Sequence, residues 1–304
     1  MRTESSFSQV DDTLRLLTER TPAYKELTER FGPLLREMAK VGDELAGTLP
    51  ELPAGDPNRI AAGVSLLVDV DLAPYGDALK LSAERLMPVL AEVLNLEEAT
   101  AKQISAHFAE SDNLVELAQA RIEGNAKYFE NASEQLEVEP TATLLYISET
   151  VFTPVLRAII TGQGKPLSDS DWDQTYCPVC GSTPSISYLS QRETTDLDQL
   201  VGGGGKKYLH CSLCGQNWRY KRNACAACGN DENKTREIFT SDKTRFERVE
   251  ACNKCGHYCL NIDMRECEPQ PDLDAIQLGL IHLDLFARKN GLVPITSTLW
   301  NSAE

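Results

Sequence analysis

Four copies of one short motif, Cys-x-x-Cys-Gly, limit the folds that are open to this chain. They lie at residues 177–181, 211–215, 225–229 and 252–256. Two thiolates separated by two residues can bind one metal ion from a tight turn, and two such turns complete a tetrahedral four-thiolate site. The glycine after each second cysteine permits the positive φ that this turn tends to require. The motif therefore predicts two metal ions, each bound by four cysteines.

The predicted metal ligands are the eight cysteines of the four motifs: Cys177, Cys180, Cys211, Cys214, Cys225, Cys228, Cys252 and Cys255. Sequential pairing, first motif with second and third with fourth, is favoured because the gaps of 30 and 23 residues leave room for a hairpin. A cross-brace, first with third and second with fourth, is the alternative. Four thiolates suit either zinc or iron of the rubredoxin type.

The remaining cysteines and the neighbouring histidines fall outside this scheme. We expect Cys259 and Cys267 to be buried or spare thiols, and His210 and His257 to be exposed bystanders beside ligands. A redox dithiol is a further reading of Cys-x-x-Cys, but that motif follows a strand in a βαβ unit, a pattern that this sequence does not have.

No pattern of catalytic residues accompanies the motifs. A four-thiolate site is coordinatively saturated and leaves no open position for activating water. The run Gly202–Gly205 lacks the Lys-Ser/Thr of a phosphate-binding loop and is better interpreted as a hairpin tip. HExxH, nucleophile-elbow and serine-triad signatures are also missing. The sequence predicts a protein that is not an enzyme.

The formal charge of −16 is unevenly distributed along the chain. Residues 177–267 hold 13 Lys and Arg against 11 Asp and Glu, so all of the excess negative charge lies elsewhere. An acidic chain repels phosphate, which argues against a nucleic-acid partner. The alternative function is still a zinc-ribbon nucleic-acid-binding protein, with positive charge from Lys206, Lys207, Arg219, Lys221 and Arg222.

The ends and apolar runs of the chain predict a cytoplasmic protein without a membrane partner. The first residues, MRTESSFSQVDDTLRLL, contain neither a continuous apolar segment nor a twin-arginine pair. The apolar stretch 60–68 is far shorter than the roughly 18 residues that a membrane span needs. The cytoplasm keeps thiols reduced, so paired cysteines there indicate metal rather than disulfides.

Apolar spacing predicts an α+β, multi-domain protein. Residues 1–165 form an all-α helical bundle, with a break at Gly32-Pro33, a loop at 49–57 and an N-cap at Asp56. Two small rubredoxin-like or zinc-ribbon-like β modules follow at 166–220 and 221–270, with short strands at 186–189, 218–220 and 237–239. A C-terminal helix and tail occupy 271–304. Modules this small usually need a metal for stability.

A possible partner surface lies between the second and third motifs. Trp218, Arg219, Tyr220 and Arg222 combine aromatic and arginine side chains, the types that dominate protein interfaces. The alternative is that Trp218 packs beneath a motif and the arginines are merely solvated. The oligomeric state is open.

The set of motifs resembles the formate dehydrogenase accessory protein family (FdhE). The resemblance rests on Cys177-Pro-Val-Cys180-Gly, on Trp218 and Arg222 around the middle motifs, on Gly256-x-Tyr258, and on the acidic helix that ends at Gly291. The tail after Gly291 departs from the family pattern. The resemblance implies a helical part followed by two rubredoxin-like modules with iron or zinc. It also implies a cytoplasmic accessory role in maturing respiratory formate dehydrogenase, through contact with the catalytic subunit of that enzyme.

Overall fold

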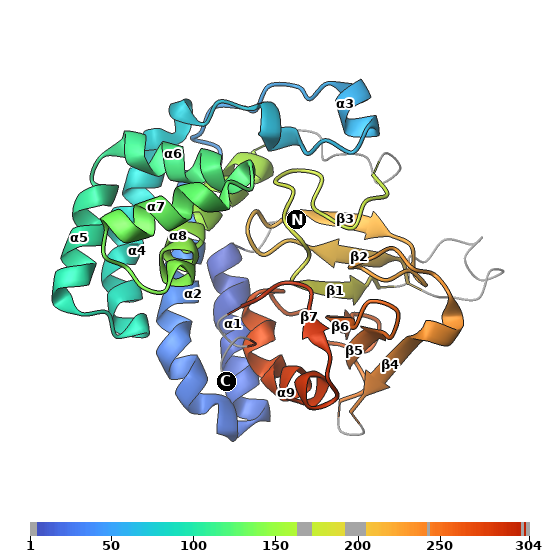
Figure 1. Ribbon diagram of the computed structural model, residues 1–304. Helices are drawn as coiled ribbons and strands as arrows, with labels where there is room; N and C mark the ends of the chain where they lie inside the picture. Colours follow the sequence, from blue (N-terminus) through green and yellow to red (C-terminus); the bar gives the residue numbers. More distant parts are fainter. Residues whose placement is uncertain (1–4, 163–171, 192–204, 242–243, 299–300, 302–304) are drawn as a thin grey trace.

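The N-terminal half of the protein is helical, as the sequence predicts. The structure is a computed structural model and describes residues 5–162, 172–191, 205–241, 244–298 and 301. Helices gather on one side of the molecule and the strands on the other (Figure 1). The helices of this half are α1 (Ser6–Arg20), α2 (Lys25–Leu45), α3 (Pro57–Ala61), α4 (Gly76–Leu94), α5 (Glu98–Phe108), α6 (Ser111–Ile122), α7 (Ala126–Gln135) and α8 (Thr141–Thr161).

Local sequence signals correctly predict where one helix begins, but they wrongly predict a break in another. The side chain of Asp56 accepts a hydrogen bond from the backbone nitrogen of Asn58, with Pro57 in the first turn, so the predicted N-cap is confirmed. The predicted break at Gly32-Pro33 is wrong, because α2 continues through Pro33. Proline removes one backbone hydrogen bond, but α2 buries Leu34 and Val41 against its neighbours, and that packing outweighs the loss.

Helix α8 is the most apolar of the described helices. Its length and a mean hydropathy of 1.3 would allow it to cross a membrane, yet 67% of that window is buried inside the protein. Ser82 donates a hydrogen bond from α4 to the carbonyl of Val151, 2.7 Å away, in the middle of α8. The helix is therefore the central core element of the helical half.

The strands of both cysteine regions join one sheet in the order β3-β2-β1-β6-β5-β4, with β7 beside β6. The two regions meet where β1 runs parallel to β6, and the other neighbours on this path are antiparallel. Three of these strands include the predicted segments, whereas β2, β5, β6 and β7 do not correspond to any predicted strand. The strands are β1 (Ile186–Leu189), β2 (Lys207–His210), β3 (Asn217–Tyr220), β4 (Arg236–Thr240), β5 (Glu247–Cys252), β6 (His257–Asp263) and β7 (Val293–Pro294).

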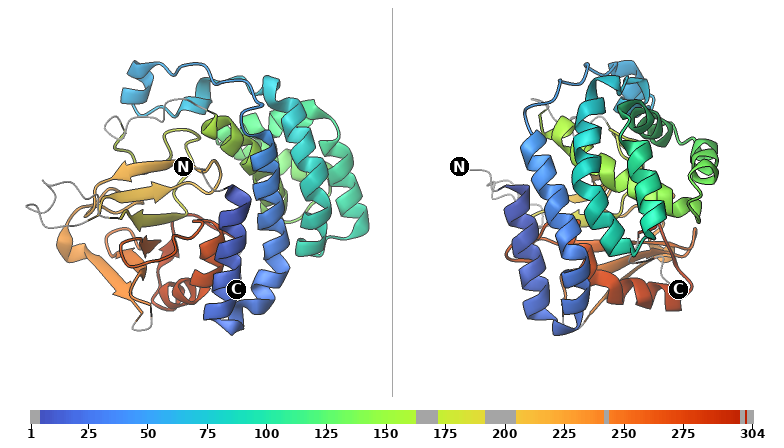
Figure 2. Two further views of the ribbon diagram at one scale, coloured as in Figure 1. Left: turned by 180° about the vertical axis from the view of Figure 1, so that it is seen from behind. Right: turned by 90° about the vertical axis from the view of Figure 1, so that its left-hand side faces the viewer.

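The C-terminal segment returns to the sheet. The single helix expected within residues 271–304 is instead a 3-10 helix, Ala275–Leu280, followed by α9 (Ile281–Lys289). Helix α1 packs against that 3-10 helix, and α9 packs against β5 and β6, as two further views show (Figure 2). A helical half, sheet modules and a C-terminal helix confirm the predicted fold class.

The core does not follow the predicted domain boundaries closely. One hydrophobic cluster joins α4 and α8 to the first two motifs, and a second joins α1 to β5, β6 and α9. The boundaries at 165, 220 and 270 stay a prediction. Most of the linker after Gly162 and the glycines 202–204 lie outside the described residues.

Candidate metal centres

The four Cys-x-x-Cys-Gly motifs fold into nearly identical turns, called knuckles below and numbered in chain order. In every knuckle the glycine nitrogen donates a hydrogen bond to the carbonyl of the first cysteine, at 2.8–3.0 Å. Each glycine has a φ between 71° and 76°, in the left-handed region that favours glycine. The residues are Gly181, Gly215, Gly229 and Gly256, so the predicted backbone role of these glycines is confirmed.

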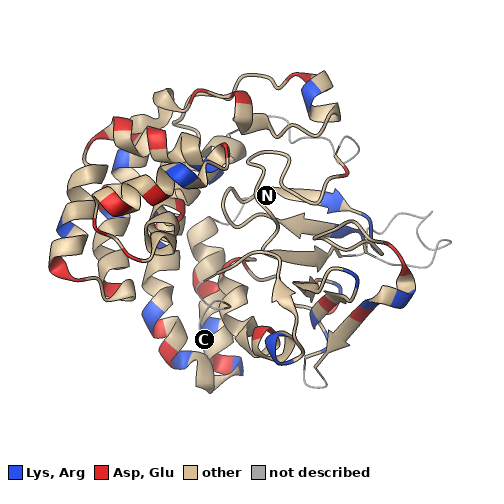
Figure 3. Cartoon of the chain, in the orientation of Figure 1, with Lys and Arg blue, Asp and Glu red and all other residues tan. Residues whose placement is uncertain are grey.

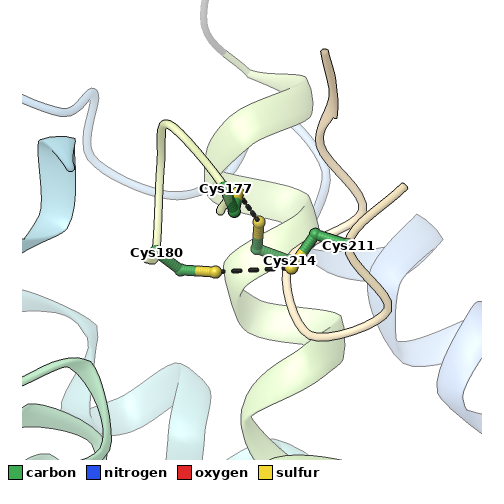
Figure 4. Close-up of side chains that lie close together, drawn as sticks. All are labelled: Cys177, Cys180, Cys211 and Cys214. Atoms are coloured by element: carbon green, nitrogen blue, oxygen red, sulfur yellow. Dashed lines mark hydrogen bonds between the residues drawn. The ribbon is translucent and has the colours of Figure 1, made fainter. Parts of the chain in front are cut away.

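The first cluster unites knuckles one and two. Its Sγ atoms converge from two loops (Figure 4), with Cys177 3.5 Å from Cys214 and Cys180 3.4 Å from Cys211. All four thiols are buried, with exposed fractions of 0–1%. The Sγ of Cys177 also accepts a hydrogen bond from the backbone nitrogen of Val179.

The second cluster unites knuckles three and four. The Sγ atoms of Cys225 and Cys255 are 3.8 Å apart, and those of Cys228 and Cys252 are 3.9 Å apart. Ala227 donates its backbone N–H to the Sγ of Cys225, as Val179 does in the first cluster. The grouping in both clusters follows sequential pairing and not the cross-brace.

Both donor sets fit a tetrahedral metal ion. Zn–S bonds of 2.3 Å in a tetrahedron separate the sulfurs by about 3.8 Å, close to the separations in both clusters. These separations are far longer than a disulfide bond of about 2.05 Å, and all ten cysteines are free. In each cluster the four Sγ atoms lie within 4.8 Å of one another. The chain therefore has two four-cysteine groups that can bind metal ions.

Side chains of the helical half clamp the first cluster. The hydroxyl of Ser65 donates to the carbonyl of Cys177 at 2.9 Å. The backbone nitrogens of Leu66 and Leu67 donate to the carbonyls of Pro178 and Val179, also at 2.9 Å. These bonds fix knuckle one to the loop that precedes α4.

Two arginines place positive charge beside the first cluster. Arg157 on α8 donates to the carbonyl of Ser212 and pairs with Asp274. Arg121 on α6 donates to the hydroxyl of Ser182 and pairs with Glu149 at 2.5 Å. Four thiolates around a divalent ion carry a net negative charge, and nearby guanidinium groups lower the cost of burying it.

The thiols within each cluster differ in proton affinity. Burial raises the pKa of Cys177 and Cys214, whereas hydrogen bonds from the other three thiols hold the pKa of Cys180 well below its usual range. The pKa of Cys252 is lowered to about 6. Burial alone would raise it, but hydrogen bonds, among them those from the backbone of Cys255 and Lys254, outweigh the effect of burial. A thiol of lowered pKa ionises readily, which is the state in which cysteine binds metal.

Of the four residues predicted to contact a partner, two are buried and two are exposed. Trp218 and Tyr220 are buried, at 3% and 7% exposure, so the expectation that they contact a partner is wrong. The indole N–H of Trp218 donates to the carbonyl of Gln174, and the hydroxyl of Tyr220 donates to the carbonyl of Cys225. Both rings pack beneath the knuckles because alternate residues of β3 face the core. Arg219 and Arg222 are exposed.

The non-ligand residues only partly match expectation. Cys259 and Cys267 are buried, as predicted. His210 is also buried, against the expectation of an exposed bystander, and its ring contacts Asp274 and Asn217. The sequence analysis missed Ser65, Arg121 and Arg157 as supports of the first cluster. They lie 55 to 112 residues from the residues in and beside the knuckles to which they donate, and no local pattern marks them.

Comparison with known proteins agrees with this geometry. Residues 176–222, which include the whole first cluster, match the family model described as FdhE, central domain. A protein FdhE homolog from Aquifex aeolicus is 34% identical over 125 residues, 41% of this chain and 41% of that protein. Protein FdhE of Escherichia coli is 28% identical over 294 residues, 89% of this chain and 86% of that protein. These matches support the resemblance of this chain to FdhE proteins.

The FdhE fold extends over the whole chain. The crystal structure of the FdhE protein from Pseudomonas aeruginosa superimposes with a TM-score of 0.58 at 21% identity, and covers 99% of this chain and 96% of that one. Sequence matches are often shorter: the alignment with an FdhE homolog from Citrobacter koseri, 26% identical, covers 70% of this chain and 59% of that protein. The second cluster lies beyond the match to the FdhE central domain.

Proposed function

We propose that this protein is a cytoplasmic accessory protein for the maturation of respiratory formate dehydrogenase, and that it binds the catalytic subunit of that enzyme. The proposal combines the similarity of this chain to FdhE proteins with the role that the family resemblance implies. The protein acts as a metal-stabilised scaffold and is not itself an enzyme.

The main support for a scaffold role is that both four-cysteine clusters would leave a bound metal ion coordinatively saturated. Each cluster already supplies four donors from the chain itself. A tetrahedral site with four protein ligands has no open position for substrate or water. A bound ion would hold two knuckles together and stabilise a sheet whose strands are only four to seven residues long in the two modules.

The charge distribution limits where a partner can bind. Acidic residues are spread over the helices of the N-terminal half, and basic residues occur near β3 and the third knuckle (Figure 3). Arg219, Lys221 and Arg222 are exposed next to one another on that segment. They form the basic segment that we propose as part of the contact with the catalytic subunit, because arginine is enriched at interface hot spots.

Affinity purification under anaerobic conditions tests the proposal. The tagged full-length chain is expressed together with the formate dehydrogenase catalytic subunit, and an unrelated cytoplasmic protein of similar size is the control prey. Enrichment of the catalytic subunit over the control is expected. Equal recovery of the two proteins would refute the accessory role.

The same preparation distinguishes the accessory role from the alternative function, a nucleic-acid-binding zinc ribbon. A nucleic-acid-binding ribbon would retain DNA or RNA at low salt and lose it steeply as salt rises. Salt-dependent retention of nucleic acid without the catalytic subunit would favour that alternative.

A further inference from the structure

The two clusters differ in their access to solvent. All four thiols of the first cluster are almost fully buried. In the second cluster Cys225 and Cys252 are buried, Cys255 is half-buried and Cys228 is exposed. The two clusters have the same donor set and similar sulfur separations, so the difference lies in what surrounds them.

The space around the knuckle glycines shows the same difference in solvent access between the two clusters. A Cβ on Gly181 would lie 3.4 Å from the hydroxyl of Ser65, and a Cβ on Gly215 would lie 3.0 Å from Cγ of Arg157. A Cβ on Gly256 would have nothing within 4 Å, and one on Gly229 would meet only the hydroxyl of Tyr220 at 3.8 Å. Residues of the N-terminal half therefore cover the turns of the first cluster, whereas the turns of the second face open space.

The hydrogen bonds that hold the knuckles also come from different parts of the protein. Ser65, Arg121 and Arg157 bring the helical half onto the first cluster. Across the described ranges, none of the bonds to knuckles three and four comes from helices α1 to α8. They come from the sheet modules and the C-terminal segment, as in the 2.9 Å bond from the nitrogen of Val293 to the carbonyl of Gly256.

The two metal clusters also differ in how they are connected to the hydrophobic core. The four cysteines of the first cluster belong to the large hydrophobic cluster that contains α4 and α8. Those of the second belong to neither hydrophobic cluster. Opening the first cluster therefore requires separating the helical half from the sheet, whereas opening the second requires only a local movement of one knuckle. Local openings of weakly packed segments have much lower free energies than global unfolding.

We infer that the second cluster is an exchange site, which takes up and releases a metal ion through Cys228, whereas the first cluster retains its ion as long as the protein stays folded. In the exchange, the bond from Cys228 Sγ to the metal would break first and an incoming thiolate or chelator donor would take its place. The bonds to Cys225, Cys252 and Cys255 would be replaced in the same way, and each released thiolate would take a proton from solvent. No electron is transferred. The inference concerns the metal sites alone and does not depend on the proposed binding of formate dehydrogenase.

Zinc release to a chelator tests the inference on the full-length, zinc-loaded protein. With excess 4-(2-pyridylazo)resorcinol, one equivalent should leave faster than the other by on the order of ten-fold or more, because it requires only local opening. Cys228→Ser should remove the fast phase and preserve the slow one. Cys180→Ser, the matched change in the first cluster, should remove the slow phase and preserve the fast one.

Alkylation of the unmodified protein supplies a test that does not depend on the folding of any variant. During a short pulse of N-ethylmaleimide, cysteines of the second cluster should be labelled first, led by Cys228, as read by mass spectrometry. Cys259 and Cys267, buried thiols outside both clusters, report labelling through general unfolding. Release of both zinc ions at one rate would overturn the inference. So would labelling of the first cluster as early as Cys228.

Discussion

The ammonium group of Lys207 on β2 is bonded to the carboxylate of Glu250 on β5, with both side chains buried. The lysine belongs to the first cysteine module and the glutamate to the second, and Lys207 also donates to the carbonyl of Ala224 at 3.4 Å, next to knuckle three. This ion pair is a polar link across the middle of the sheet.

Replacing one member of that pair should destabilise the protein. Lys207→Met leaves Glu250 as a buried carboxylate without its main partner, so we expect a loss of about 3–5 kcal/mol in the free energy of unfolding. Adding Glu250→Gln should restore part of it. The measurement is urea denaturation of the metal-loaded protein. Lys102→Met is the control, because its bridge to Glu98 is exposed and worth at most about 1 kcal/mol. Equal losses in both variants would contradict the prediction.

The two knuckle glycines with opposite surroundings should respond differently to alanine. Gly215→Ala and Gly256→Ala both force alanine into a positive φ, which costs about 1–2 kcal/mol. Gly215→Ala should lower the thermal midpoint further, because its Cβ would press on Arg157 whereas that of Gly256→Ala meets open space. Calorimetry of the two metal-loaded variants compares them, and a larger shift for Gly256→Ala would be inconsistent with the structure.

The carboxyl of Asp284 should make stability depend on pH. Burial raises its pKa to about 6, although the hydroxyl of Tyr258, which donates to it at 2.6 Å, and the charge of Arg288 act in the opposite direction. The folded protein thus holds this proton more tightly than the unfolded chain, whose aspartate pKa is about 3.9. The favourable contribution is present below about pH 4 and is lost as the pH rises through about 6.

The variant Asp284→Asn removes that titration. Relative to the variant, the unmodified protein should lose up to about 3 kcal/mol of unfolding free energy between pH 4 and pH 7. Denaturation curves at half-unit pH intervals measure the difference. A difference that does not vary with pH, or that grows in favour of aspartate, would count against the raised pKa.

The exposed arginines on and just after β3 should matter for binding, and the buried Trp218 should matter for folding. Arg219→Ala with Arg222→Ala should weaken binding of the catalytic subunit while metal content and thermal midpoint stay unchanged, because both side chains are exposed. Trp218→Ala should instead cost about 3–5 kcal/mol of stability through the cavity that it leaves. Binding assays and elemental analysis of the same preparations separate the two effects. Unchanged affinity in the arginine variant would exclude these residues from the contact.

The sequence by itself determined the local chemistry. Cys-x-x-Cys-Gly specifies a turn with two thiolates and a glycine of positive φ, because spacing and backbone preference act within five residues. Apolar periodicity likewise predicted the helical half, and the signal at Asp56-Pro57 predicted an N-cap. These features depend on near neighbours in the chain, so one sequence suffices to predict them.

Only the tertiary structure decided how those parts meet. The choice of sequential pairing, the parallel contact of β1 with β6, and the burial of Trp218 all depend on contacts between distant residues. The same holds for the unequal exposure of two chemically identical clusters. Ser65 and Arg157 cover one cluster because α8 and the loop before α4 pack on the sheet there, and no spacing within the motifs encodes that packing.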